Sequence, residues 1–210
     1  MKYKFITVEG NIGAGKTSLA KKLGVHYNAK LILETFAENP FLPKFFEDAK
    51  RYAFSAELFF LADRYQQLHE QLKAFGLFSN QTISDYVFVK SLLYSKVNLS
   101  EDEFKLFQRI FHIMYPSLPE PDLLVYIHSS VERIIRNIRK RGRNFEQSVG
   151  KQYLLKIQNA YFEYFKQKPN LKILIINADT IDFVKNENHF HKIVDLIEKD
   201  YKAGINYINI

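Results

Sequence analysis

Short apolar runs rich in β-forming residues recur along the chain, and longer stretches with helical spacing separate them. The runs are Tyr3–Val8, Leu31–Leu33, Gln81–Ser84, Leu123–Ile127 and Leu171–Ile176. Buried strands have this pattern, so the sequence predicts five strands. It does not decide whether the final apolar stretch, Ile205–Ile210, packs on the core or on a partner.

Helical patterns fill the segments between the predicted strands. Ser100 followed by Glu103 predicts a capping box at the start of one of these helices. Strands that alternate with helices predict an α/β fold, with a five-stranded parallel sheet flanked by helices. The helical stretches begin at Ser18–Gly24 and continue with Tyr52–Phe75, Glu101–Met114, Val131–Lys140, Lys151–Phe165 and His189–Tyr201.

Composition narrows the class of protein. The chain has 210 residues, enough for one α/β domain over residues 1–210. It has no cysteine, which excludes disulfides and cysteine metal sites. No apolar run approaches ~18 residues and the first segment is a strand, so we expect neither a membrane span nor a leader. These features predict a cytoplasmic enzyme.

The stretch from Gly10 to Thr17 fits the phosphate-binding pattern G-x-x-x-x-G-K-[ST] at every defined position. It lies between a predicted strand and a predicted helix, as this loop requires. Backbone N–H groups and the helix dipole would then bind the phosphates of ATP. Lys16 would reach the β- and γ-phosphates, and the Thr17 hydroxyl would hold Mg²⁺. The expected ATP-binding residues are Gly10, Asn11, Ile12, Gly13, Ala14, Gly15, Lys16, Thr17 and Ser18.

Two carboxylates follow predicted strands near this loop. Ligands of parallel sheets bind beyond the carboxyl ends of the strands, where Glu34 and Asp85 should lie. Glu34 is the candidate base for an acceptor hydroxyl, and Asp85 is a candidate partner for Mg²⁺. By position alone, an exposed strand-end glutamate and a turn aspartate are equally good interpretations.

The net charge of +7 is concentrated around one short segment, Arg139–Arg143. This clustering indicates a local anionic target, so we expect no nucleic-acid partner. Arginine grips phosphate oxygens through two N–H groups, so residues 139–148 are predicted to form a basic lid over the triphosphate. Arg139 would contact ATP, and Arg141 and Arg143 would act in transfer together with Lys16. Arg133 and Arg136 are interpreted as a solvated helix face.

Several motifs together resemble the deoxyribonucleoside kinase family over nearly the whole chain. The loop has the family's form Glu-Gly-Asn-Ile-Gly-x-Gly-Lys-[ST], and Pro119–Leu123 matches the family's entry to its fourth strand. Residues 51–54 with Glu57 and Arg64 match the helix that carries the base site. Residues 141–146 followed by Tyr153-Leu154 match the lid and the next helix, and the bacterial branch is the most similar.

The resemblance implies ATP- and Mg²⁺-dependent phosphorylation of a deoxynucleoside 5′-hydroxyl by a homodimer with the P-loop kinase fold. It assigns Glu34 as the base, Arg141 and Arg143 as phosphate contacts, and Glu146 as a contact to the sugar 3′-hydroxyl. Arg64 falls at a base-reading position, and Asp85 completes the expected substrate site.

The sequence departs from the family pattern at three positions. Glu57 replaces a base-reading glutamine; because a carboxylate only accepts hydrogen bonds, we expect a preference for deoxyadenosine and then deoxycytidine. Tyr86 replaces an arginine after the third strand, so we expect Lys90 or the lid to supply the phosphate contact of that arginine. Phe46 replaces a tyrosine that helps Glu146 hold the sugar.

Two other functions remain open from the sequence. The stretch Asp63-Arg64-Tyr65 resembles a motif of nucleoside-monophosphate kinases, although here it lies within a predicted helix. A non-catalytic, nucleotide-binding regulatory protein is the second alternative, since the arginine expected at Tyr86 is absent.

Overall fold

Six parallel strands form the central sheet of the computed structural model, which describes residues 2–35, 39–72 and 81–209. Their order across the sheet is β2-β3-β1-β4-β5-β6, and neighbouring strands are parallel throughout. The predicted parallel α/β sheet is therefore confirmed. The strands are β1 (Phe5–Gly10), β2 (Lys30–Ile32), β3 (Thr82–Ser84), β4 (Leu123–His128), β5 (Lys172–Asn177) and β6 (Gly204–Asn209).

The predicted count of five strands is wrong, because the final apolar stretch adds a sixth. Residues Gly204–Asn209 pair in parallel with β5 and form the edge strand β6. Ile205 and Tyr207 are about half exposed, whereas Ile208 packs against the core. A half-exposed edge strand mixes polar and apolar residues, so it lacks the continuous apolar run that marks the buried strands.

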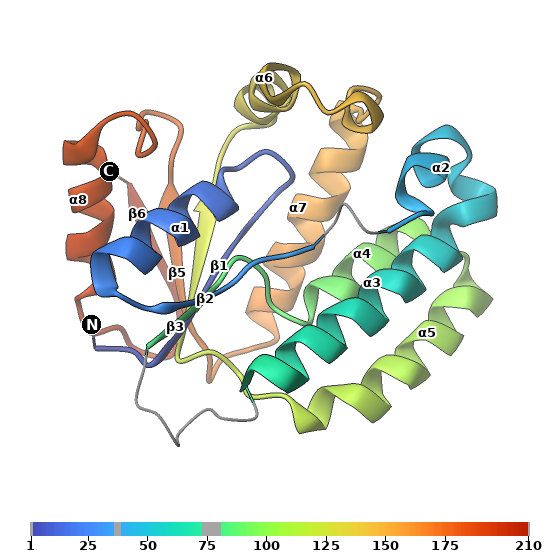
Figure 1. The fold of residues 1–210 in the computed structure, drawn as a ribbon, viewed down its shortest axis with the longest axis horizontal. Helices are drawn as coiled ribbons and strands as arrows, with labels where there is room; N and C mark the ends of the chain where they lie inside the picture. Colours follow the sequence, from blue (N-terminus) through green and yellow to red (C-terminus); the bar gives the residue numbers. More distant parts are fainter. Residues whose placement is uncertain (1, 36–38, 73–80, 210) are drawn as a thin grey trace.

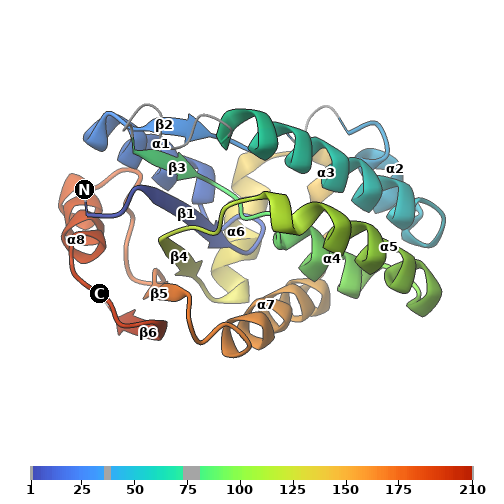
Figure 2. The same cartoon turned by 90° about the horizontal axis from the view of Figure 1, so that it is seen from below.

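Helices cover both faces of the sheet (Figures 1 and 2). The helices α1 (Lys16–Tyr27) and α8 (Glu187–Ile197) pack on one face. The opposite face carries α3 (Ala49–Leu72), α4 (Lys90–Asn98), α5 (Glu101–Met114) and α7 (Lys151–Lys166). Two further helices, α2 (Leu42–Glu47) and α6 (Val131–Arg141), lie beyond these layers.

Most of the predicted helices form with ends close to those expected. The capping box of α5 is confirmed, with the backbone N–H of Ser100 donating to Glu103 Oε2 over 3.0 Å. The predicted end of the third helix, at Phe75, lies outside the described residues. The sequence did not predict α2, which is short, or α4, whose buried side includes the polar Lys90 and Ser91.

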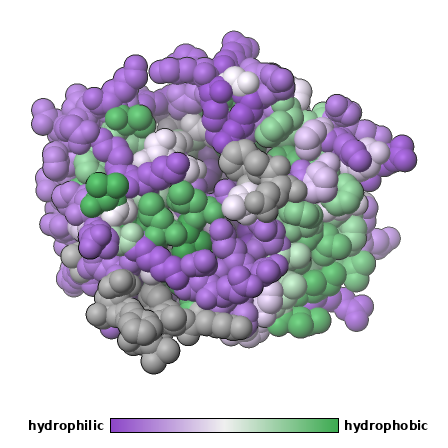
Figure 3. All heavy atoms as spheres, viewed as in Figure 1, coloured by the Kyte–Doolittle hydropathy of each residue, from purple (hydrophilic) through white to green (hydrophobic). Residues whose placement is uncertain are grey.

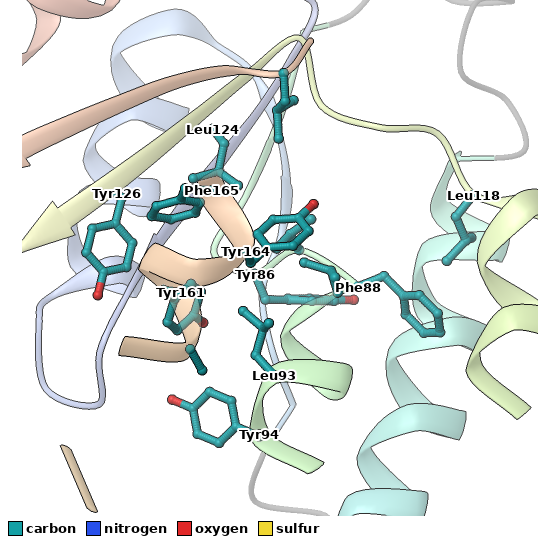
Figure 4. Packing of buried hydrophobic residues seen from close by; sticks show 14 of the residues in the cluster. Tyr86, Phe88, Leu93, Tyr94, Leu118, Leu124, Tyr126, Tyr161, Tyr164 and Phe165 are labelled. Carbon is teal, nitrogen blue, oxygen red and sulfur yellow. The ribbon is translucent and has the colours of Figure 1, made fainter. Parts of the chain in front are cut away.

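The core between the sheet and the α3–α7 side is rich in aromatic side chains (Figure 4). Beneath the phosphate loop this core also contains the carboxylate of Glu9, the penultimate residue of β1. Glu9 accepts hydrogen bonds from the Tyr161 hydroxyl over 2.7 Å and from the Val87 backbone N–H over 2.8 Å. Glu9 therefore connects β1 to α7 and to the segment after β3, close to the site described next.

Candidate active site

The phosphate loop turns between β1 and α1 with a left-handed backbone at two glycines. Gly13 has φ 78° and Gly15 has φ 95°, a region that glycine adopts without strain. Lys16 Nζ donates to the Asn11 carbonyl over 3.0 Å. Burial, followed by repulsion from Lys90, lowers the pKa of Lys16 to about 8. A polyphosphate beside Lys16 would favour its charged form.

Two cavities meet at this loop. The inner cavity lies between α3, α4 and α7, with Phe60 and Tyr153 among its walls. The outer cavity extends along the loop to α6 and the segment after β5. Residues that line both cavities are Gly13, Lys16, Thr17, Glu34, Arg141 and Arg143. The predicted catalytic residues therefore lie at the junction, where a group could pass from one cavity to the other.

Thr17, Asp85 and Glu34 form a connected chain at the carboxyl end of the sheet. The Thr17 hydroxyl donates to Asp85 Oδ2, and the Glu34 backbone N–H donates to Asp85 Oδ1 over 2.8 Å. A hydroxyl and a carboxylate beside a phosphate loop suit Mg²⁺, which takes few protein ligands and uses phosphate oxygens as well. Among the described residues, no group of three or more His, Asp or Glu side chains is placed so that it could hold a metal ion.

Glu34 is held between two buried cations. Arg64 Nη2 lies 2.6 Å from Oε1, and Lys90 Nζ lies 2.7 Å from Oε2. Burial alone would raise the pKa of Glu34, but Lys90 and Arg64 outweigh it and hold that pKa well below its usual range. Glu34 is therefore an ionised carboxylate at neutral pH, rather than an exposed strand-end residue.

Lys90 occupies the region that the absent arginine was expected to serve. Tyr86 is fully buried, and its hydroxyl hydrogen-bonds the side chain of Gln67, over 2.5 Å, rather than facing the cavities. Lys90, four residues further along at the start of α4, lines the inner cavity and contacts Glu34. Arg141 and Arg143 of the lid also line this cavity, so both replacements considered from the sequence stay predictions.

Glu57 lies in the wall of the inner cavity with one satisfied oxygen. Asn98 Nδ2 donates to Oε1 over 2.6 Å and also contacts the Tyr153 hydroxyl at 3.2 Å. Burial raises the pKa of Glu57 to about 7, against the lowering effects of Arg64 and Asn98. Asn98 was not predicted, because it is 41 positions from Glu57 and belongs to no motif.

The predicted lid lies over the junction of the cavities. Glu146 is buried and accepts hydrogen bonds from Arg141 Nη2 and, over 3.1 Å, from Arg143 Nη1. The ring of Phe46, from α2, lies 5.7 Å from that of Phe145. The structure thus brings Arg141, Arg143, Glu146 and Phe46 together, with the expected sugar contact already paired to both lid arginines.

One arginine of α6 differs from its sequence interpretation, and another stays untested. Arg133 does not lie on a solvated face, because its guanidinium donates to the carbonyls of Asp179 and Ile181 and it lines the outer cavity. The interpretation missed this because both acceptors follow β5, far away in the sequence. Arg139 is exposed and lines neither cavity, although its neighbours Lys140 and Arg141 line the outer one. Its contact with ATP stays a prediction.

Comparison with known proteins connects this geometry to a family. The family model described as deoxynucleoside kinase matches residues 6–201. The chain belongs to the deoxynucleoside kinase family. The resemblance drawn from the motifs is confirmed, and the protein is a deoxynucleoside kinase, a transferase that binds nucleotides.

Relatives and solved structures agree with this assignment. A deoxyguanosine kinase of Bacillus subtilis is 35% identical over 90% of this chain and 93% of its own. A deoxyadenosine kinase of Lactobacillus acidophilus is 31% identical over 92% of this chain and 94% of its own. The structure of a deoxyadenosine kinase from M. mycoides shares the fold, with a TM-score of 0.79 at 20% identity over 92% and 98% of the chains. In the described part of this kinase, no helix is long and apolar enough to cross a membrane.

Gly13→Ala should disrupt the junction of the cavities. A Cβ at Gly13 would lie 2.9 Å from Ile138 Cγ1 and 3.2 Å from the Ile134 carbonyl, at a φ of +78° that alanine rarely adopts. We expect a loss of about 1–3 kcal/mol of folding stability and weaker ATP–Mg²⁺ binding, measured by thermal unfolding and calorimetry.

Gly150→Ala is the matched control, because a Cβ there meets nothing within 4 Å and its φ is −85°. Equal effects of the two substitutions on stability and binding would contradict the strain argument.

Proposed function

We propose that this kinase transfers the γ-phosphoryl group of ATP, with Mg²⁺, to the 5′-hydroxyl of a deoxyribonucleoside. The meeting of the two cavities at Lys16, Thr17, Glu34 and the lid arginines carries the proposal. The outer cavity would hold the triphosphate, and the inner cavity would hold the nucleoside. A cytoplasmic location, expected from the sequence, stays a prediction.

Glu34 would accept the hydrogen bond of the 5′-hydroxyl. Its pKa is held low, so it is a weak proton acceptor early in the reaction. This is tolerable because phosphoryl transfer passes through a loose transition state with little bonding to the incoming oxygen. The hydroxyl needs to be oriented first and to lose its proton late. An ionised carboxylate fixed by two cations suits that role.

The cations at the junction would stabilise the charge of the migrating phosphoryl group. Lys16 would contact the β- and γ-phosphates, and Arg141 and Arg143 would turn from Glu146 toward the phosphate oxygens. Thr17 and Asp85 would hold Mg²⁺, which neutralises phosphate charge when bound. Closure of the lid would also keep water from the phosphoryl group.

The nucleoside would lie with its sugar near the lid and its base deeper in the inner cavity. Glu146 would accept the 3′-hydroxyl bond in exchange for one of its arginine contacts, and Phe46 would pack on the sugar side. Phe60 and Tyr153 offer aromatic surface near Glu57 and Arg64, which suits a planar base.

For the base itself, we propose one that carries an exocyclic amino group. Deoxyadenosine and then deoxycytidine were expected from Glu57, and thymidine should be poor. Guanine also carries an amino group, and relatives named as kinases for deoxyguanosine, deoxyadenosine, and deoxyadenosine with deoxycytidine are all similar to this chain. An acceptor at Glu57 is therefore compatible with three bases, adenine, cytosine and guanine.

We also propose that the kinase is a homodimer, as its family resemblance implies. Leu106 and Ile113 lie seven positions apart on α5, so they share one face of that helix, and they are 48% and 81% exposed. Apolar side chains gather on the side of the molecule where α3 and α5 lie (Figure 3). A second copy would cover this face.

A panel of acceptors tests the function. We expect rapid transfer from ATP–Mg²⁺ to deoxyadenosine, deoxycytidine or deoxyguanosine, and little transfer to thymidine. Thymidine monophosphate is the control for the nucleoside-monophosphate kinase alternative. Transfer to the monophosphate alone would favour that alternative, and no transfer to any acceptor would favour a regulatory protein.

Glu34→Gln should lower kcat by roughly 10²–10⁴, because the amide cannot accept the hydroxyl proton. The affinity for ATP–Mg²⁺ should change little, because the substitution leaves Lys16, Thr17 and Asp85 in place. Steady-state kinetics and calorimetry measure both quantities, with thermal unfolding to verify the fold. Glu70→Gln, at an exposed position of α3, is the control. A kcat for Glu34→Gln equal to that of this control would remove Glu34 from the reaction.

Ile113→Lys should convert the dimer to a monomer, because it buries a charge in the proposed interface. Light scattering after size-exclusion chromatography measures the mass. Val25→Lys, at an equally exposed apolar position on α1, should leave the dimer intact. A monomeric parent, or a dimer that persists in Ile113→Lys, would contradict this interface.

A further inference from the structure

Two side chains that line the inner cavity each carry a buried oxygen atom without a hydrogen-bond partner. The two atoms are Glu57 Oε2 and the Tyr94 hydroxyl, and no described residue donates to either one or accepts from the latter. An unsatisfied buried polar atom costs about 1–3 kcal/mol, so a ligand that satisfies it gains affinity. Because both side chains line the same cavity, a polar ligand bound there would satisfy such an oxygen once its side chain turns toward the ligand.

The amino-bearing bases differ in what they place beside their amino group. Guanine presents two adjacent donors, the ring N1–H and the exocyclic amino group. Adenine and cytosine present an amino donor next to an unprotonated ring nitrogen, which is an acceptor. An ionised carboxylate has two acceptor oxygens, whereas a protonated one has a donor and an acceptor. Each form of a carboxyl group therefore matches a different base.

We propose that the protonation state of Glu57 selects the base, with ionised Glu57 taking deoxyguanosine and protonated Glu57 taking deoxyadenosine or deoxycytidine. This inference rests on the proposed 5′-kinase activity and deepens it. With guanine bound, the two oxygens of the ionised carboxylate would accept hydrogen bonds from N1–H and from the amino group. With adenine or cytosine bound, the protonated oxygen of Glu57 would donate to the ring nitrogen, and the other oxygen would accept from the amino group.

Asn98 fixes which oxygen of Glu57 would carry the proton. Its amide donates to Oε1 over 2.6 Å, so Oε1 must remain an acceptor. The proton of the neutral form therefore belongs on Oε2, the buried oxygen that has no partner. Oε1 has a second lone pair for the amino group of the base. The neutral carboxyl group is thus oriented before a base arrives.

The surroundings of Glu57 put this equilibrium within reach of neutral pH. Burial raises the pKa of Glu57 to about 7, and the attraction of Arg64 and Lys90 counteracts it only partly. Both cations are already paired with Glu34 at 2.6 and 2.7 Å, which limits what they offer to a second carboxylate. The charged and titratable side chains that line the same cavity are Arg64 from α3, Lys90 and Tyr94 from α4, Tyr153 from α7, Glu34 after β2, Lys16 of the phosphate loop, and Arg141, Arg143 and Glu146 of the lid.

The ratio of kcat/KM for deoxyguanosine to that for deoxyadenosine is the direct measurement. Because one substrate needs the ionised form and the other the protonated form, the ratio should rise about tenfold per pH unit. The ratio is measured for the wild-type enzyme from about pH 6 to about pH 8.5. This range lies on both sides of the pKa of Glu57, which burial raises to about 7. Ionisation of other groups, such as Lys16 or ATP, affects both substrates alike and cancels in the ratio.

Two substitutions separate the role of Glu57 from that of its surroundings. Glu57→Gln has a permanent donor and acceptor, so it should favour deoxyadenosine over deoxyguanosine by a ratio that no longer changes with pH. Asn98→Ala removes a hydrogen bond that lowers the pKa of Glu57. It should therefore decrease the deoxyguanosine-to-deoxyadenosine ratio at every pH while the slope is retained. Glu163→Gln, at an exposed position of α7, is the matched control and should behave as wild type.

The outcomes distinguish this inference from the function on which it rests. Transfer to deoxynucleosides with a ratio that stays constant over pH would overturn the inference and leave the kinase activity intact. A pH-dependent ratio that persists in Glu57→Gln would assign the effect to another group and would also overturn it. Absence of transfer to any deoxynucleoside at any pH would instead contradict the proposed function.

Discussion

The buried ion cluster of Glu34, Arg64 and Lys90 is the constraint on which the site depends. Charged side chains tolerate burial only when they are paired, and removal of one partner of such a pair commonly costs about 3–5 kcal/mol. The three residues come from the segment after β2, from α3 and from α4, and their side chains are at most 15% exposed. Their pairing fixes how these two helices meet the carboxyl end of the sheet, beside the phosphate loop.

Two carboxylates that line one cavity have pKa values shifted in opposite directions, because only Glu34 contacts the cations. Glu34 has two cations in contact, so the ionised form dominates and its pKa is low. Glu57 has a neutral amide in contact, so burial dominates and its pKa rises to about 7. Environments that separate the pKa values of two nearby groups are typical of catalytic sites, where each group needs its own protonation state.

The parts of this site that the sequence predicted are those whose geometry is local. The phosphate loop is contiguous, and Glu34 and Asp85 follow strands whose carboxyl ends must meet at one edge of a parallel sheet. The pairings of Asn98 with Glu57 and of Arg133 with the segment after β5 depend on packing between distant segments. Helix α4 was not predicted because it buries Lys90 and two serines, and the final apolar stretch was left undecided because β6 mixes polar and apolar residues, as a half-exposed edge strand does.

Residue type alone was also too little to predict the choice of base. Glu57 was expected to act only as a hydrogen-bond acceptor, which is true of an ionised carboxylate. Its residue type does not determine whether the group is ionised. Protonation is decided by burial and by competition for Arg64 and Lys90, and neither can be seen before the fold is known. Glu57 lines the cavity and has an unpartnered oxygen, so it resembles a glutamine when protonated and differs from it when ionised. Glutamate in place of the family's glutamine therefore changes the hydrogen-bond pattern at this position only when Glu57 is ionised.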